Sequence, residues 1–392
     1  MLRLLTAGES HGPELTAIIE GLPAGIPVSR DDIDADLIRR QKGAGSGGRM
    51  CIEKDRVRIT GGVPAGMTTG GPVSLVITNK DFQSWKDRDI SPMTIPRPGH
   101  ADLTAAVKYG YRDLRLGLER ASARETATRV AVGAICRRFL GEFRIVIGSY
   151  TVSIGSVKAE LQGEYPDLFR RAEESPVRCP DESASRQMVD EIARAKEAKD
   201  TVGGVFECVA LNLPTGLGSH VHWDRRLTAR LMAAVGSIPA VKGVQFGNAF
   251  EYVSHWGTEV HDSLAPDPDN SGRPLVRTTN RAAGLEGGIT TGMPLVIRAA
   301  MKPISTTLKG IESVDLVSGE RVMTQYERSD ICAVPRACVV AEAMAAFVLA
   351  DALVEKLGGD SLEEMRPRYR ALRESSIHEL PMNNKAWRFS YE

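Results

Sequence analysis

Residues 337–357, ACVVAEAMAAFVLADALVEKL, are the stretch of this 392-residue chain that decides its fold. The stretch predicts a long helix with apolar residues on most of its faces. A helix of that kind is usually buried between layers of other secondary structure. We expect it to lie inside a layered protein, because no apolar run approaches the roughly 20 residues of a membrane span.

Patterns on either side of this helix predict further helices and antiparallel strands. Helices are expected at Ser29–Gln41, at Asp102–Leu114, from a capping box at Ser122–Glu125 onward, at Ser183–Lys199 and at Asp224–Val235. Strands are expected at Val57–Thr60, Val73–Thr78, Ile145–Val157, Gly204–Leu213, Phe250–Val260 and Pro294–Met301. Strands and helices do not alternate, which argues against a Rossmann fold. The predicted fold class is α+β, with antiparallel sheets around buried helices.

Two segments have no regular pattern. Asp81–Pro98 is polar and rich in Asp, Trp and Pro, and long loops of this kind are often functional. The tail from Gly358 to Glu392 is charged and aperiodic. No linker or low-complexity tract marks a domain boundary, so one large domain is as open as the two or three that length suggests.

The bulk composition excludes several classes of partner. Fifty basic residues balance fifty acidic ones, so net charge predicts no nucleic-acid and no membrane partner. The six cysteines form no C-x-x-C pair, which favours buried free thiols over disulfides or zinc ligands. The first residues, MLRLLTAGES, lack the features of a signal peptide, so we expect a cytoplasmic protein.

Three short clusters carry titratable groups among glycines and arginines: GESHG at Gly8–Gly12, RPGHAD at Arg97–Asp102 and ERSD at Glu327–Asp330. Histidine exchanges protons near neutral pH, which makes His11 and His100 candidates for acid–base catalysis. A hydrogen-bonded structural role is the alternative for each. Asp330 is either a buried carboxylate or the partner of Arg328 in a salt bridge.

A set of arginines predicts an anion site. Arg39, Arg40 and Arg49 flank a glycine-rich loop, whereas Arg97, Arg120, Arg124 and Arg328 each stand beside another candidate residue. Converging guanidinium groups bind phosphate and carboxylate through paired hydrogen bonds. A solvated surface is the alternative for any one of them. Ser122 either caps a helix or serves such a site, and Lys302–Thr306 offers hydroxyls and backbone amides to a phosphate.

Two further patterns are weaker. Gly284–Gly292 is a glycine-rich turn without the G-K-[ST] of a Walker loop, so it fits a flat ligand better than a P-loop. His220 and His222 have the spacing of zinc ligands on a strand face. No third ligand stands out, so we expect no metal site.

From the residues alone, the leading function is a phosphate-handling lyase or hydrolase that uses two histidines. A flavin-free phosphohydrolase is a second enzyme class. A module that binds anionic ligands or RNA through the arginines is the non-catalytic alternative, although the balanced charge counts against it.

Several longer stretches then resemble one family. GESHGPELTAIIEGLPAG at Gly8–Gly25, ERASARETATRVAVGAICR at Glu119–Arg137 and RSDICAVPRACVVAEAM at Arg328–Met344 resemble the three signatures of chorismate synthases. RPGHAD, SIPAVKGVQFG and GGITTGMPLVIRAAMKPIST are also similar to that family. The resemblance covers residues 1–355 in order. It implies a single domain over residues 1–392, with a tail at 358–392 that matches no pattern.

The resemblance implies an activity and an assembly. Chorismate synthases are carbon–oxygen lyases that convert 5-enolpyruvylshikimate 3-phosphate to chorismate and phosphate in the shikimate pathway of aromatic amino-acid biosynthesis. The reaction is a 1,4-anti elimination that requires reduced FMN without net redox change. The family fold is a β-α-β sandwich, with helices layered between antiparallel sheets, and the family assembly is a homotetramer.

The resemblance also implies roles for individual residues. His11 would protonate the departing phosphate, His100 would serve the reduced flavin, and Asp330, relayed through Ser10 or Ser122, would manage a proton at the flavin. The substrate's anions would be held by Arg40, Arg49, Arg97, Arg124 and Arg328. Flavin contacts would fall on Arg120, Ala121, Ser122, Pro239, Ala240, Gly287, Lys302, Pro303, Ile304, Ser305, Thr306 and Arg328.

This chain departs from the family pattern at two of these places. Pro239 stands where Asn or Gln is usual, which removes a side-chain contact to the flavin. Ser46 stands where many members have an arginine that is linked, together with the position of Arg40, to NADP binding. We therefore expect an enzyme whose FMN is reduced by an external source.

Overall fold

The computed structural model describes residues 1–47, 53–267, 275–327, 329–376, 378–380 and 382–390. Two antiparallel sheets form its main layers. The first has the order β1-β2-β4-β3, and its strands are β1 (Arg3–Ala7), β2 (Glu14–Glu20), β4 (Val73–Thr78) and β3 (Val57–Gly61). The second has the order β6-β5-β7-β13-β8, and its strands are β6 (Val157–Lys158), β5 (Val146–Ile154), β7 (Gly204–Leu211), β13 (Leu295–Met301) and β8 (Val241–Phe246).

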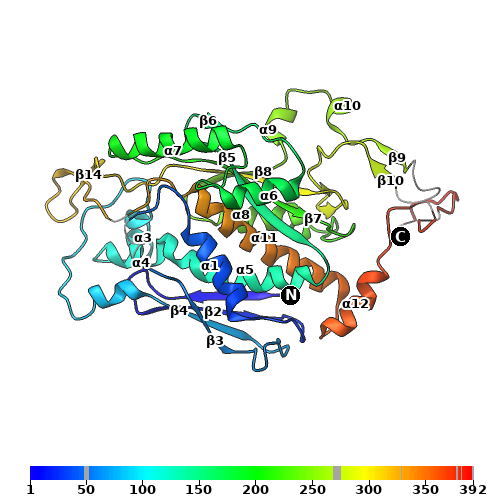
Figure 1. Ribbon diagram of the computed structural model, residues 1–392, viewed down its shortest axis with the longest axis horizontal. Coiled ribbons are helices and arrows are strands. Elements are labelled where there is room, and N and C mark those ends of the chain that lie inside the picture. Colours follow the sequence, from blue (N-terminus) through cyan, green and yellow to red (C-terminus); the bar gives the residue numbers. More distant parts are fainter. Residues whose placement is uncertain (48–52, 268–274, 328, 377, 381, 391–392) are drawn as a thin grey trace.

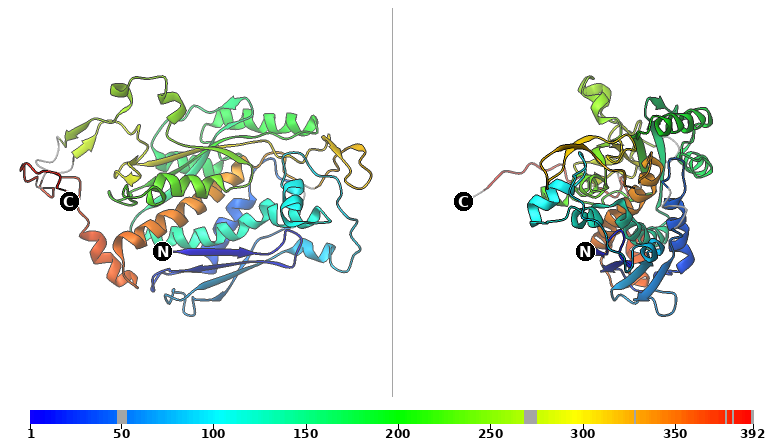
Figure 2. Two further views of the ribbon diagram at one scale, coloured as in Figure 1. Left: turned by 180° about the vertical axis from the view of Figure 1, so that it is seen from behind. Right: turned by 90° about the vertical axis from the view of Figure 1, so that its left-hand side faces the viewer.

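A layer of helices separates the two sheets (Figure 1). Its members are α1 (Arg30–Gln41), α5 (Thr126–Gly141), α8 (Leu227–Gly236) and α11 (Val334–Leu357). Helix α5 packs on β2 and β4 of the first sheet, whereas α11 packs on β5 and β7 of the second. Two more helices, α6 (Tyr165–Glu174) and α7 (Glu182–Glu197), cover the outer face of the second sheet, and Figure 2 shows the same order of layers from behind. The predicted α+β class, with helices layered between antiparallel sheets, is confirmed.

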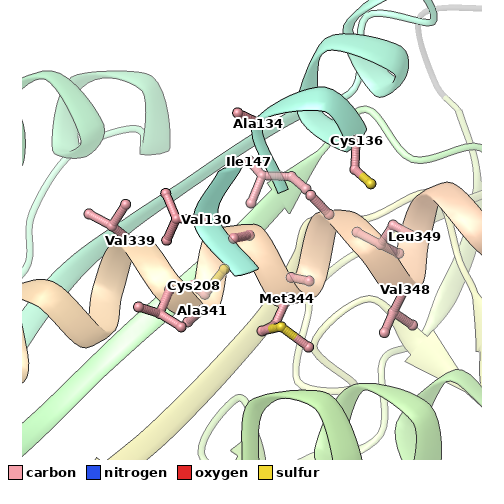
Figure 3. Close-up of a cluster of buried hydrophobic side chains, with 14 of the residues drawn as sticks. Val130, Ala134, Cys136, Ile147, Cys208, Val339, Ala341, Met344, Val348 and Leu349 are labelled. Atoms are coloured by element: carbon pink, nitrogen blue, oxygen red, sulfur yellow. The ribbon is translucent and has the colours of Figure 1, made fainter. Parts of the chain in front are cut away.

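The core lies where α5 and α11 cross. Side chains of both helices and of β5 and β7 interdigitate there, among them Val130, Ile147, Cys208, Met344 and Leu349 (Figure 3). Burial of so many apolar side chains, each contributing about 1.5–3 kcal/mol, explains why a helix this apolar is stable in water. The expectation that no apolar run approaches the length of a membrane span was wrong for α11, which is long and apolar enough by length and composition. However, 83% of its most apolar window is buried inside the molecule.

Most predicted elements appear within a few residues of their expected bounds. The capping box at Ser29 is present, since the Ser29 hydroxyl accepts from the Asp32 N–H and the Asp32 carboxylate accepts from the Ser29 N–H. Five of the six cysteines, Cys136, Cys179, Cys208, Cys332 and Cys338, are buried and free, as predicted. Cys51 lies outside the described residues.

The remaining elements connect the layers and close their ends. They are η1 (Lys80–Ser84), α3 (Asp102–Tyr109), α4 (Arg115–Ala121), η2 (Ala123–Glu125), η3 (Trp223–Arg225), α9 (Ala249–Tyr252), α10 (Gly257–Val260), β9 (Leu264–Pro266), β10 (Leu275–Arg277), β11 (Leu285–Glu286), β12 (Ile289–Thr290), β14 (Glu312–Val314), β15 (Arg321–Met323) and α12 (Leu362–Arg370).

Some predictions of secondary structure were wrong. The strand expected at Phe250–Val260 is instead two short helices, α9 and α10, and Phe250 and Val253 are 78% and 83% exposed. Strand formers need a neighbouring strand and a buried face, and this segment has neither. The helix expected to reach Leu114 ends at Tyr109, because Gly110 takes the left-handed conformation that terminates helices. The aperiodic tail contains α12, which Ser361 caps.

Candidate active site

The first residues of α11 border a cavity of about 410 Å³, at the end of the helix layer where α3 and α4 lie (Figure 1). Its size falls in the usual range for small-molecule sites, about 300–1,000 Å³. Loops from both sheets and from the helix layer meet there. The structure brings most of the predicted site residues to its wall: Ser10, His11, Arg40, Arg97, His100, Ala121, Ser122, Arg124, Pro239, Ala240, Lys302, Ile304, Ser305, Thr306 and Asp330.

His11 is held by a glutamate of α4. Its Nδ1 atom lies 2.7 Å from Glu119 Oε1, and its backbone N–H donates to Glu119 Oε2 at 2.7 Å. Burial raises the pKa of the Glu119 carboxyl, but the hydrogen bonds and the charge of His11 outweigh burial, so the pKa falls below its ordinary value. Glu119 is therefore an anion at neutral pH, and it holds the imidazole ring of His11 in the cavity wall.

Ser10 and Ser122 connect this loop to the start of α5. The Ser10 hydroxyl donates to the Ser122 hydroxyl at 3.0 Å, and Ser122 accepts from the Arg124 N–H at 3.3 Å. Ser122 caps the 3-10 turn η2 in this way, rather than α5 itself, which starts at Thr126. The Ser122 residue thus caps this turn and also lines the cavity.

Arg97, His100 and Asp102 form a second cluster around a fully buried carboxylate. Arg97 donates to both Asp102 oxygens at 2.8 and 2.9 Å, and His100 Nδ1 lies 2.6 Å from Asp102 Oδ1. Burial raises the pKa of Asp102, but Arg97 and His100 outweigh it and hold this pKa well below the usual range. Arg97 also donates to the Thr306 hydroxyl at 3.0 Å, so all three of its guanidinium nitrogens bind protein groups.

Two buried arginines share one carboxylate. Arg124 Nη1 contacts both Asp55 oxygens at 2.7 and 2.8 Å, while Arg40 Nη1 lies 3.4 Å from Asp55 Oδ2. Burial lowers the pKa of Arg40 to about 10. The negative charge of Asp55 acts in the opposite direction and raises this pKa, whereas the positive charge of Arg124 lowers it further. A third group, Asn79, accepts from Arg124 Nε at 2.8 Å. The two guanidinium groups and Asp55 therefore form one buried charged cluster at the cavity wall.

Arg124 keeps one donor atom without a hydrogen bond. Its Nη2 atom is buried and has no hydrogen-bond partner, although the Glu53 carboxylate stands 3.9 Å away. An unused donor on a buried charge costs free energy unless a ligand satisfies it. The Arg124 side chain is thus suited to hold an anion in the cavity.

Asp330 also lines the cavity. Its Oδ1 accepts from the Gly47 N–H at 2.8 Å, and its Oδ2 forms an ion pair with Arg336, which also donates to the Ser46 hydroxyl. Within the described residues its ionic partner is therefore Arg336. Arg328 and Arg49 lie outside the described residues.

The loop after β13 completes the wall beside His100. Lys302 Nζ donates to the Gly99 carbonyl at 3.0 Å, and the Lys302 N–H donates to the Ala240 carbonyl at 3.0 Å. Ala240 has a left-handed backbone with φ of 68°, uncommon for alanine, which lets the Pro239–Ala240 turn reach this loop.

Three predicted flavin contacts do not line this cavity. Arg120 donates to the Thr6 carbonyl at 3.0 Å, Gly287 lies beside His220, and Pro303 is outside the wall. Their assignment stays a prediction.

His222 is exposed and pairs with Asp224 at 2.6 Å, and no three His, Cys, Asp or Glu side chains gather for a metal in the described part of the chain.

Sequence reasoning missed several residues of the site. Glu119, Asp55 and Arg336 hold the candidate groups in place. The Trp85 ring packs against that of His11 in a tilted arrangement, with the ring centres 4.2 Å apart. Trp85 follows η1 in the Asp81–Pro98 segment, whose composition already suggested function. Glu119 and Arg336 stand inside the second and third family-like stretches, but nothing local distinguished them from surface charges.

Comparisons with known proteins agree with this geometry. The sequence model described as chorismate synthase matches residues 2–354. A chorismate synthase of Aquifex aeolicus is 49% identical over 386 residues, covering 94% of this chain and 96% of that protein. That of Bacillus subtilis is 48% identical over 391 residues, covering 96% and 99%. A crystal structure titled chorismate synthase superimposes with a TM-score of 0.77 at 43% identity, covering 94% of this chain and 96% of that one.

Proposed function

Because the chain belongs to the chorismate synthase family, we propose that it converts 5-enolpyruvylshikimate 3-phosphate to chorismate and phosphate with the help of reduced FMN. The observation that carries this proposal is one cavity that combines a carboxylate-held histidine, His11, with the cationic pair Arg40 and Arg124. A substrate with one phosphate and two carboxylates needs such a cationic wall, and a departing phosphate needs a proton.

Arg124 and Arg40 are proposed to bind the substrate's anionic groups. Support comes from the buried Nη2 of Arg124, which has no hydrogen-bond partner, and from the place of both arginines in the cavity wall. Arg49 and Arg328 are proposed to join them, on the family resemblance alone. Arg97 is better suited to holding Asp102 and Thr306, because those groups already occupy its guanidinium nitrogens.

His11 is proposed as the acid for the leaving phosphate. As an imidazolium it gives a proton to the phosphate oxygen while the C–O bond breaks, and the electron pair of that bond leaves with the phosphate. A positioned acid of this kind contributes about 10²–10⁴-fold to the rate. Glu119, an anion at neutral pH, stabilises the imidazolium before the transfer.

We propose that the cavity also holds the flavin. Its volume of about 410 Å³, the hydroxyls of Ser305 and Thr306, and the cation of Lys302 suit a flat ring with a phosphate tail. Bound in the reduced form, FMN would supply electron density to the breaking C–O bond, which no side chain can do. His100, oriented through Asp102, would hold the flavin's ring edge, while Ser122 and the Pro239–Ala240 turn would line its surroundings.

Asp330 is proposed to manage a proton at the flavin, as the family resemblance implies. The Gly47 N–H and Arg336 hold its carboxylate at the cavity wall. The hydroxyls of Ser10 and Ser122, 3.0 Å apart, provide a path along which a proton can pass between loops.

We further propose that an external source reduces the FMN. Ser46 donates to the Gly43 carbonyl at 2.7 Å and accepts from Arg336, so the side chain of residue 46 itself brings no cation to a nicotinamide phosphate. We propose a cytoplasmic homotetramer without nucleic-acid or membrane partners, in keeping with the family resemblance and the balanced charge of the chain.

The proposal is tested by the stoichiometry of the two products. Purified protein with reduced FMN and 5-enolpyruvylshikimate 3-phosphate should release phosphate and form chorismate in equal amounts. Phosphate release without chorismate, and without need of flavin, would assign the cavity to a phosphohydrolase instead.

A further inference from the structure

Resting on the proposed function, we infer that Glu119 is a positioning residue that fixes His11 with a proton on Nδ1, so that Nε2 is the atom that serves the substrate phosphate. No motif or family resemblance gave Glu119 a role. The inference begins with a double contact: the two oxygens of one carboxylate hold the ring and the backbone of the same histidine, each at 2.7 Å.

This double contact fixes the ring as well as the loop. The Ser10 N–H donates to the Glu119 carbonyl at 3.0 Å, so three hydrogen bonds attach residues 10 and 11 to the last turns of α4. Rotation of the His11 ring about its bond to the backbone would break the Nδ1 contact while the backbone contact remained. The side-chain contact therefore orients the ring, and the other two contacts position the loop.

The charge of Glu119 decides which nitrogen carries the proton. A carboxylate can only accept, so Nδ1 of a neutral His11 must keep its hydrogen toward Glu119. Proton transfer from the imidazolium then occurs from Nε2 to the phosphate oxygen, and the Nδ1–H bond is unchanged. Glu119 also stabilises the imidazolium form that exists before the transfer, as the carboxylate of a catalytic triad does for its histidine.

Neighbouring groups keep Glu119 ionised. Arg115 stands one helical turn before it in α4, and its positive charge lowers the pKa of Glu119 further. The Arg115 Nε and Nη1 atoms are buried without a hydrogen bond, and its guanidinium lies 5.4 Å from the centre of the Trp85 ring, which in turn packs on His11. The Arg115 guanidinium therefore acts on Glu119 through its positive charge, without a direct hydrogen bond to the Glu119 carboxylate.

Glu119→Gln tests this inference, because the amide keeps the size of the side chain and an acceptor for the His11 backbone. Its NH₂ group would donate to Nδ1 and move the ring proton to Nε2. Glu142→Gln is the matched control: the two glutamate side chains are 14% and 13% exposed, and Glu142 pairs with Arg138 at 2.9 Å, away from the cavity. Far-UV spectra and thermal melting check that each variant folds.

We expect Glu119→Gln to lower kcat by at least ~10²-fold while KM and the FMN dissociation constant change by less than about threefold. Glu142→Gln should match the unchanged protein. Nitrogen-15 spectra of histidine-labelled protein without substrate, with the His11 signal assigned through His11→Ala, should show Nδ1 protonated in the neutral ring and Nε2 protonated in Glu119→Gln.

Three results would overturn the inference: a kcat for Glu119→Gln within about threefold of the unchanged protein, an unaltered ring tautomer, or a loss confined to stability and FMN binding. Failure of the unchanged protein to make chorismate would instead overturn the proposed function. The tautomer measurement needs no substrate, so it still decides the role of Glu119 in that event.

Discussion

Gly133 of α5 lies so close to Ala343 of α11 that a β-carbon on residue 133 would overlap the Cα and Cβ atoms of Ala343. The two helices cross at this contact, in the centre of the layer between the sheets. The close approach is possible because glycine has no side chain. The register of α11 against α5, and with it the place of Arg336 at the cavity, depends on this contact.

Gly133→Ala should therefore lower the free energy of unfolding by about 1–3 kcal/mol, since neither backbone can move without disturbing the core. Gly141→Ala is the control in the same helix, where the nearest atom to an added β-carbon is Arg138 Nη1 at 3.9 Å. Urea-induced unfolding measures the free energy of unfolding of both variants, provided that this free energy falls with urea concentration at the same slope in each. Equal midpoints for the two variants would contradict the proposed fit.

His11→Ala and His100→Ala should each keep the fold and lose at least ~10²-fold in kcat, the usual scale of acid–base catalysis. The reason is that each ring is held by a carboxylate at the cavity, Glu119 for His11 and Asp102 for His100. His222→Ala is the control, because His222 also pairs with a carboxylate but is exposed. A variant of His11 or His100 with near-normal kcat would remove that residue from the mechanism.

Arg124→Lys should raise KM for the phosphorylated substrate about 10–100-fold, the effect of losing one charged hydrogen bond of about 1.5–3 kcal/mol. Lysine keeps a charge near Asp55 but cannot present the Nη2 donor. FMN affinity, followed by flavin fluorescence, should change little. Arg58→Lys serves as the control, since Arg58 of β3 pairs with Glu14 of β2 and both side chains are exposed. Equal losses of substrate and FMN affinity in Arg124→Lys would contradict the assignment.

Asp102→Asn should destabilise the protein by about 3 kcal/mol at neutral pH, because it leaves the Arg97 charge buried without its partner. The folded-state pKa of Asp102 is depressed, so its contribution is complete above the ordinary value of 3.8 and is lost as pH falls below it. The difference in unfolding free energy should be constant through mildly acidic pH and shrink below pH 3.8. A difference in unfolding free energy that grows on acidification would contradict the predicted direction. Asp224→Asn, at an exposed aspartate, is the control and should change the unfolding free energy little.

Local patterns predicted α11 well because a nearly all-apolar helix has only one stable environment, the interior. They failed at Phe250–Val260, where strand-forming residues are exposed and find no partner strand. That outcome depends on neighbours that the sequence pattern does not contain.

Local sequence patterns likewise predicted some residues of the site and missed others. His11 and His100 were identifiable from their glycine- and arginine-rich surroundings. Their partners were harder: Glu119 is 108 residues from His11, and Asp55 is 69 residues from Arg124. A buried carboxylate between arginines looks, in sequence, like any surface charge, and only the fold shows which charges are buried together.

The central claim, that this cavity eliminates phosphate from its substrate with reduced FMN, is tested most directly by anaerobic turnover. Photoreduced and oxidised FMN are compared at equal concentration with 5-enolpyruvylshikimate 3-phosphate, and chorismate is measured. We predict chorismate with reduced FMN and none with oxidised FMN, without net oxidation of the flavin. Equal chorismate formation in both samples, or none in either, would contradict the claim.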